Sequence, residues 1–84
     1  MKRWHEKTLA AIFGHPASAN VRWHDIEALL KSLGGEIEER EVSRVAIILF
    51  GEVQVFHWSH PEPITDKGAV ASVRRWLASH GVEP

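Results

Sequence analysis

The chain contains no cysteine among its 84 residues. This absence excludes disulfide bonds, thiolate zinc sites and thiol nucleophiles, and it suits a protein of a reducing compartment. Long apolar runs are also missing, since no stretch approaches the roughly 20 residues that a membrane-spanning helix requires. The N-terminal segment MKRWHEKTLAAIFGHP lacks the continuous apolar core of a secretory signal. We therefore expect a soluble, cytoplasmic protein.

An overall excess of charge is absent as well. Ten Lys and Arg residues against eleven Asp and Glu residues give a formal net charge of −1, so no global positive potential marks a nucleic-acid-binding protein. The charges are unevenly spread, however. Residues 36–41 hold four acids and one base, whereas residues 66–81 hold three Lys and Arg residues and one acid. Any RNA-binding surface must therefore be local.

Three segments place apolar residues at helical spacing. The segment 2–16 ends in Gly14 and Pro16, and the segment 23–35 ends in two glycines. The segment 65–81 begins with a candidate cap, Thr65 or Asp66, and ends at Gly81. The stripes predicted to face the core comprise Trp4, Leu9, Ile12 and Phe13 in the first helix, Ile26, Leu29, Leu30 and Leu33 in the second, and Val70, Val73, Trp76 and Leu77 in the third.

Three strands are predicted between the second and third helices. Residues 35–42 are polar, as in an exposed edge strand, and residues 43–51 are almost wholly apolar, as in a central strand. Residues 53–60 form a third strand, joined to the second by a tight turn at Gly51 and Glu52. The chain is thus predicted to be one α+β domain over residues 1–84, with two layers and the helices on one face of an antiparallel sheet.

The third strand has apolar residues on both of its sides. Strand alternation places Val53, Val55 and His57 on one side. Phe56 and Trp58 point to the other side, and we expect this aromatic pair at or near the face that the helices leave open. Exposed aromatic residues of this kind indicate a binding surface.

The segment HPEPITDKGAVASVRRWLASHG, together with DIEALLKSLGG and the strand pair SRVAIILFG and VQVFH, resembles the HicA toxins of bacterial HicA–HicB toxin–antitoxin systems. The likeness covers about residues 22–82, and the N-terminal segment resembles the extra helix of the longer members. It implies a double-stranded-RNA-binding-like α-β-β-β-α fold and an mRNA interferase that cleaves RNA without a metal. It also implies a HicB antitoxin as partner.

The chain departs from the family pattern near two strand ends. In the shorter HicA proteins a catalytic histidine follows a Gly-Ser pair. In this chain Val42 stands at the position of the glycine, and Arg44 stands at the position of the histidine. Longer members also carry arginine at the histidine position, but they have Arg-Pro where this chain has Trp58 and Ser59. These changes remove basic and turn-forming residues and add apolar surface.

Metal-free RNA cleavage requires a base for the 2′-OH, a group that stabilises the phosphorane charge and an acid for the 5′-oxygen. Histidine suits the base and the acid near neutral pH, and arginine suits the charge. A two-histidine site needs a bulge at Ser59, because residues 57 and 60 of a regular strand point to opposite faces. The alternatives are that His60 alone contacts a phosphate or a 2′-OH beside the helix start, or that it is a strand-end histidine bonded to a backbone carbonyl. The candidate catalytic residues are His60, His57 and Arg44, and the candidate RNA-binding residues are Lys67, Arg74 and Arg75.

Two other functions stay open. The first is a binding module that keeps the fold and the HicB-facing surface without the chemistry. The second is an altered scaffold that forms a homodimer through the edge strand carrying Trp58, with an interface of Val42, Phe56, Trp58 and Ser59. We expect no metal and no cofactor, because His5, His15, His24 and His80 do not have the spacing of a zinc site.

Overall fold

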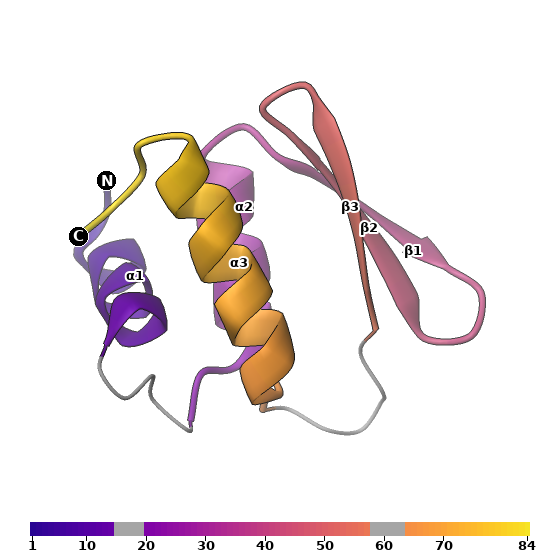
Figure 1. Cartoon of the computed structure of the whole chain (residues 1–84), viewed down its shortest axis with the longest axis horizontal. Coiled ribbons are helices and arrows are strands. Elements are labelled where there is room, and N and C mark those ends of the chain that lie inside the picture. Colours follow the sequence, from indigo (N-terminus) through magenta and orange to yellow (C-terminus); the bar gives the residue numbers. More distant parts are fainter. Residues whose placement is uncertain (15–19, 58–63) are drawn as a thin grey trace.

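The computed structural model describes residues 1–14, 20–57 and 64–84. Within these ranges the chain forms three helices and three strands in the predicted order (Figure 1). The elements are α1 (Arg3–Phe13), α2 (Trp23–Ser32), β1 (Glu36–Arg40), β2 (Arg44–Leu49), β3 (Glu52–His57) and α3 (Lys67–Ser79). The fold class is therefore α+β, as the sequence predicts.

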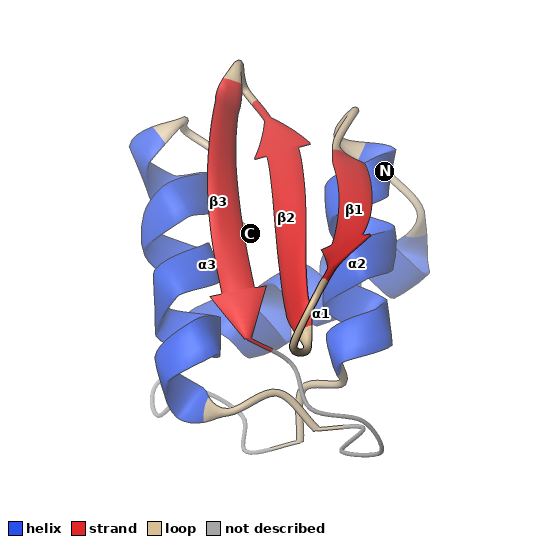
Figure 2. Cartoon of the chain, turned by 90° about the vertical axis from the view of Figure 1, so that its right-hand side faces the viewer, coloured by secondary structure: helices blue, strands red, loops and turns tan. Residues whose placement is uncertain are grey.

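The three strands form one open antiparallel sheet with β2 in the centre (Figure 2). The central position suits β2, because most of its residues are apolar and buried. β1 is exposed along most of its length and is rich in glutamate, as expected of an edge strand. The turn to β3 consists of Phe50 and Gly51, one residue earlier than predicted, because Leu49 already pairs with Glu52.

The helices lie on one face of the sheet, but they form two layers instead of the single layer predicted. α2 and α3 lie next to the sheet, and α1 packs against both of them on the side away from the strands (Figure 1). α1 is thus an outer layer that covers the other two helices. None of the described helices is long and apolar enough to cross a bilayer.

The predicted stripes of α2 and α3 form the core. The residues Ile26, Leu29, Leu30, Val70, Val73, Trp76 and Leu77 are all buried, and Leu33 lies at the margin. The inward face of α1 differs from the predicted one by about one residue position. Trp4 is 52% exposed, whereas His5, Thr8, Leu9 and Ile12 face inward. This inward set has the spacing i, i+3, i+4, i+7 of one helix face.

The helix ends follow the predicted signals. α2 ends in a Schellman motif, in which the N–H of Gly35 donates to the carbonyl of Leu30 over 2.9 Å and Gly34 has a φ of +97°. Gly35 cannot be replaced without movement, because a Cβ there would lie 2.8 Å from the Leu30 carbonyl oxygen. Gly81, with a φ of +77°, ends α3 in the same way. The Asp66 carboxylate caps the start of α3 by accepting from a backbone N–H over 2.8 Å.

The prediction that Phe56 lies near the open face is wrong. Its ring packs inside, with its centroid 5.6 Å from that of Trp23 and 6.4 Å from that of Trp76. Phe56 pairs across the sheet with the buried Val45, which confirms that this side of β3 faces the helices. The opposite set, Val53, Val55 and His57, forms the open face. Apolar residues on both sides of β3 left its orientation undetermined by the sequence.

Candidate functional site on the open face of the sheet

The open face presents three rows of side chains, each with one residue from every strand. Two rows combine a glutamate of β1 with apolar residues of β2 and β3, and the third row is basic. The rows are Glu36–Ile48–Val53, Glu38–Ala46–Val55 and Arg40–Arg44–His57. The two valines are 56% and 50% exposed. Ala46 of the central strand is itself buried, so the exposed apolar surface lies on the β3 side of this face. The open face therefore has an acidic β1 side, an apolar β3 side and a basic end.

Arg44 and His57 contact each other at this basic end. They are cross-strand partners, and Arg44 Nε donates to His57 Nε2 in a long hydrogen bond of 3.4 Å. Both side chains are exposed. Nε2 accepts a proton only when the imidazole is neutral and carries its hydrogen on Nδ1. The contact thus places a guanidinium, which binds phosphate well, beside an imidazole nitrogen that can accept a proton.

The β1–β2 turn beside this contact has an unusual backbone. Val42 and Ser43 both have a φ of 58°, and the N–H of Arg44 donates to the carbonyl of Glu41 over 3.3 Å. Two successive positive φ values are typical of a type I′ turn, which favours Asn and Gly and strongly disfavours valine. The Val42 side chain is 77% exposed. A shallow pocket connects this turn to the basic end, and it is lined by Arg40, Glu41, Val42, Arg44 and Val55.

The predicted RNA-binding residues of α3 occupy two separate parts of that helix. Lys67 is the first residue of α3, and it begins the helix at the end of the molecule where β3 stops (Figure 1). Arg74 and Arg75 lie further along α3, on the helix side of the sheet. They point in directions about 100° apart, as neighbours on a helix do. Arg75 lines a groove between α3 and β3.

The structure therefore brings together two of the three predicted catalytic residues. His60 lies outside the described residues, as do Trp58 and Ser59, and their predicted roles stay predictions. Among the other interface residues, Val42 is exposed beside the basic end, whereas Phe56 is only 7% exposed and contributes to the core.

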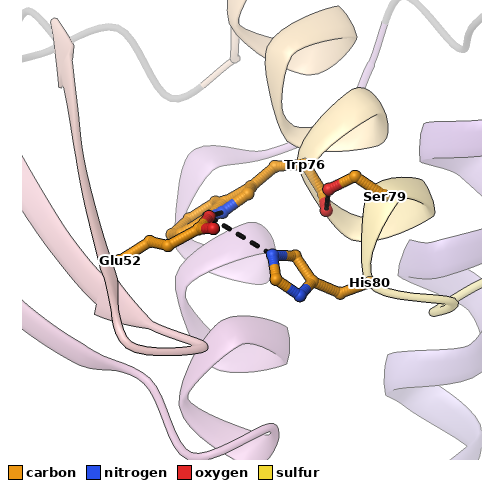
Figure 3. A network of polar contacts seen from close by, with 4 residues as sticks. All are labelled: Glu52, Trp76, Ser79 and His80. Carbon is orange, nitrogen blue, oxygen red and sulfur yellow. Dashed lines mark hydrogen bonds and ion pairs between the residues drawn. The ribbon is translucent and has the colours of Figure 1, made fainter.

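A polar cluster that the sequence did not predict joins the start of β3 to the end of α3 (Figure 3). Glu52 Oε1 accepts from Trp76 Nε1 over 2.7 Å and lies 3.2 Å from His80 Nε2. The hydrogen bond from Trp76, followed by the one from His80, holds the pKa of Glu52 below its ordinary value. His80 also stacks on Phe50, with ring centroids 4.1 Å apart. Glu52 and His80 are 28 residues apart, so no local pattern could have revealed the cluster.

A hollow lies between the start of α1 and the end of α2, and Trp4, His5, Lys31 and Leu33 contribute to its lining. The rings of Trp4 and His5 stack with centroids 5.1 Å apart. His5 is buried, and its Nδ1 has no hydrogen-bond partner among the described residues. That atom is itself inaccessible, so it does not offer a contact to a molecule in the hollow.

No group of three or more His, Asp or Glu side chains in the described part of the chain is placed to hold a metal ion. Comparison with known proteins does not assign the chain to a family. No family model matches it, and neither a curated protein nor a solved structure matches it significantly.

Proposed function

We propose that the chain is an RNA-targeting protein similar to the HicA toxins, and that it acts at the basic end of the open face. The observation that carries this proposal is the 3.4 Å contact between Arg44 and His57. This contact supplies two of the three functions that metal-free RNA cleavage needs, a base and a stabiliser of negative charge. The order of the elements is also that of the double-stranded-RNA-binding-like fold implied by the resemblance.

Two arginines lie at this end, and Arg40 Nη2 is 3.8 Å from Glu38 Oε1 in an exposed ion pair that a phosphate can replace. Arg40 and Arg44 are neighbours in the basic row and line the same shallow pocket. A phosphate bound there would compete with His57 for Arg44, because a hydrogen bond to an anion is stronger than one to a neutral imidazole. Arg44 would then turn to the phosphate and leave the His57 Nε2 lone pair free. Such contacts position the RNA without selecting its sequence.

The proposed reaction begins when His57 Nε2 takes the proton of a ribose 2′-OH. The 2′-oxygen attacks the adjacent phosphorus, and the bond from phosphorus to the 5′-oxygen breaks. That oxygen takes a proton from an acid, for which His60, in the motif that carries the resemblance, is the candidate. The products are a 2′,3′-cyclic phosphate and a 5′-hydroxyl. Arg44 binds the non-bridging oxygens, whose negative charge increases in the transition state.

A HicB-type antitoxin is the partner that the resemblance implies. An antitoxin that covered the open face would block the basic end and bury the half-exposed valines Val53 and Val55. Burial of such aliphatic side chains contributes to binding affinity. The exposed valines on the β3 side of the open face support a protein partner of this kind.

The test is incubation of the purified chain with an end-labelled single-stranded RNA in the presence of a chelator. We expect products that end in a 2′,3′-cyclic phosphate. His57→Ala and Arg44→Ala should each lower the rate by about 100-fold or more, which is typical for loss of a general base or of one charge-stabilising donor.

His24→Ala is the matched control, because the His24 side chain is 70% exposed and lies on α2. It should cleave RNA at the rate of the parent. Cleavage that survives both His57→Ala and Arg44→Ala would place the chemistry elsewhere. Binding of RNA without any cleavage would support the non-catalytic binding module.

A further inference from the structure

We propose a second binding site, independent of RNA, at the outer edge of β3, where an extended peptide segment of another protein adds to the sheet as a fourth strand. β3 pairs with β2 along one side, and no described strand pairs with its other side. An unpaired edge presents backbone N–H and C=O groups that another extended chain can pair with. The sheet has two such edges, and their side chains distinguish them.

The two edge strands differ in charge. β1 carries three glutamates and an arginine in its five residues, a composition that discourages strand pairing. β3 carries no Lys, Arg or Pro over Glu52–His57. Its valines, Val53 and Val55, are half exposed on the open face, and aliphatic residues of an added strand can pack beside them. The edge of β3 is therefore the receptive one.

The opposite side of an added strand would meet a polar groove. α3 lies behind the sheet and on the outer side of β3, so a fourth strand would run over this helix (Figure 2). The groove between the two elements is lined by Glu52, Gln54, Ser72, Arg75, Trp76 and Ser79. Every second side chain of an added strand would point into this groove.

Arg75 determines the charge of the side chain that the groove accepts. It is exposed, and its Nη2 donates to Ser72 Oγ over 3.3 Å. No carboxylate in the described ranges forms an ion pair with it. The acid of the groove, Glu52, already accepts hydrogen bonds from Trp76 and His80. The preferred segment thus alternates β-branched residues, which face the same side as Val53 and Val55, with acidic residues that face Arg75.

The position of α3 favours a separate peptide over a second copy of the chain. If two β3 strands paired antiparallel, about a two-fold axis perpendicular to the sheet, both α3 helices would lie on the same face of the joined sheet. Each α3 extends past the outer side of its own β3 (Figure 2), so the two helices would compete for the same space beneath the joint. An isolated extended segment brings no helix and avoids this collision.

The probe is a fluorescein-labelled peptide of alternating Val and Glu, about seven residues long, titrated with the full chain and followed by fluorescence anisotropy. We expect saturable binding that weakens about tenfold in Arg75→Ala, as expected for loss of one charge-assisted contact. Arg3→Ala, which removes an exposed arginine of α1, is the matched control and should bind like the parent. A peptide with the same side chains but N-methylated alternate amides should not bind, because it cannot pair with a strand edge.

Backbone NMR of the labelled chain locates the contact. The amide signals of β3 and of the α3 residues around Arg75 should shift on addition of the peptide, and those of β1 should not. The proposal is overturned if the N-methylated peptide or Arg75→Ala binds as tightly as its parent, or if the probe does not bind at millimolar concentration. Sedimentation as a dimer with protected β3 amides in the absence of peptide would also overturn it, since a second copy would then occupy the edge.

Discussion

Among the described residues, Val42 is the one least suited to its own backbone conformation, with a φ of 58°. A left-handed conformation costs an L-residue about 1–2 kcal/mol, and the exposed side chain gains little burial in return. Glycine suits a positive φ at this position. We expect Val42→Gly to raise the free energy of unfolding by roughly 1 kcal/mol, since the relief of strain exceeds the added chain entropy of about 0.5–1 kcal/mol. Urea denaturation followed by tryptophan fluorescence measures this difference.

Val42→Ala is the matched control for backbone strain. It removes the branched methyl groups but keeps a Cβ, and therefore keeps most of the cost of the positive φ. Its stability should stay close to that of the parent. If Val42→Gly is no more stable than Val42→Ala, the strain at this turn does not limit the stability of the chain.

Phe50 shows how packing compensates for the same conformation. It also has a φ of 58°, but its ring stacks on His80 at 4.1 Å and meets Trp76 edge-on at 5.9 Å. These contacts with α3 fix the β2–β3 turn at Phe50 and Gly51. Since they come from residues distant in sequence, the turn could be predicted only to within one position.

Glu52, at the start of β3, makes the stability of the fold depend on pH. Its pKa is lowered in the folded chain, mainly by the hydrogen bond from Trp76. A carboxyl with a lowered folded pKa stabilises the fold above its unfolded pKa, and this stabilisation is lost as the pH falls through the folded value. We expect Glu52→Gln to be less stable than the parent at pH 7, and the difference to shrink as the pH falls below about 4.3, the ordinary value for glutamate.

Urea unfolding of both chains over a series of pH values measures this effect. Trp76→Phe is the matched variant, because it keeps an aromatic ring and removes the N–H that Glu52 accepts. Its stability should depend less on acid pH than that of the parent. If the free energies of unfolding of the parent and of Glu52→Gln differ by the same amount at every pH, Glu52 does not have a lowered pKa in the folded chain.

Among the helices, α2 provides the clearest test of how the layers are packed. Leu30 has no exposed surface and belongs to the predicted stripe. We expect Leu30→Ala to lower the free energy of unfolding by roughly 2–5 kcal/mol, the usual range for a buried leucine. That is a large part of the approximately 4–13 kcal/mol expected for a domain of this length. Chemical denaturation measures the loss, and Lys31→Ala, at the exposed neighbouring position, should cost much less.

The helices and strands were predictable from the sequence to different extents. The stripes of α2 and α3 depend on spacing within one element, and the structure confirms them. The orientation of β3 depends on which of two partly apolar sides meets the helices, and this is a tertiary choice. The contact between Arg44 and His57 depends on the register of β2 and β3, so the sequence identified both residues without showing that they touch.

On the scale of the whole molecule, helix packing and sheet edges together determine which surfaces are free. The helices cover one face of the sheet, which leaves the open face and the two strand edges available (Figure 2). Charged side chains protect the β1 edge, and α3 extends past the β3 edge. The composition, with its net charge of −1, gives no indication of this arrangement. The basic end and the receptive edge arise only when the strands pair.

The oligomeric state tests this arrangement. The sequence favours a homodimer through the predicted third strand, residues 53–60, which was predicted to include Trp58, because a long edge without Lys or Pro is prone to pairing. The position of α3 opposes the antiparallel two-fold form of that pairing. We therefore expect the chain at micromolar concentration to sediment with the mass of one copy, and Trp58→Arg to sediment in the same way. A parent dimer that Trp58→Arg converts to a monomer would instead support the homodimer, and it would mean that two copies meet in a geometry that keeps their α3 helices apart.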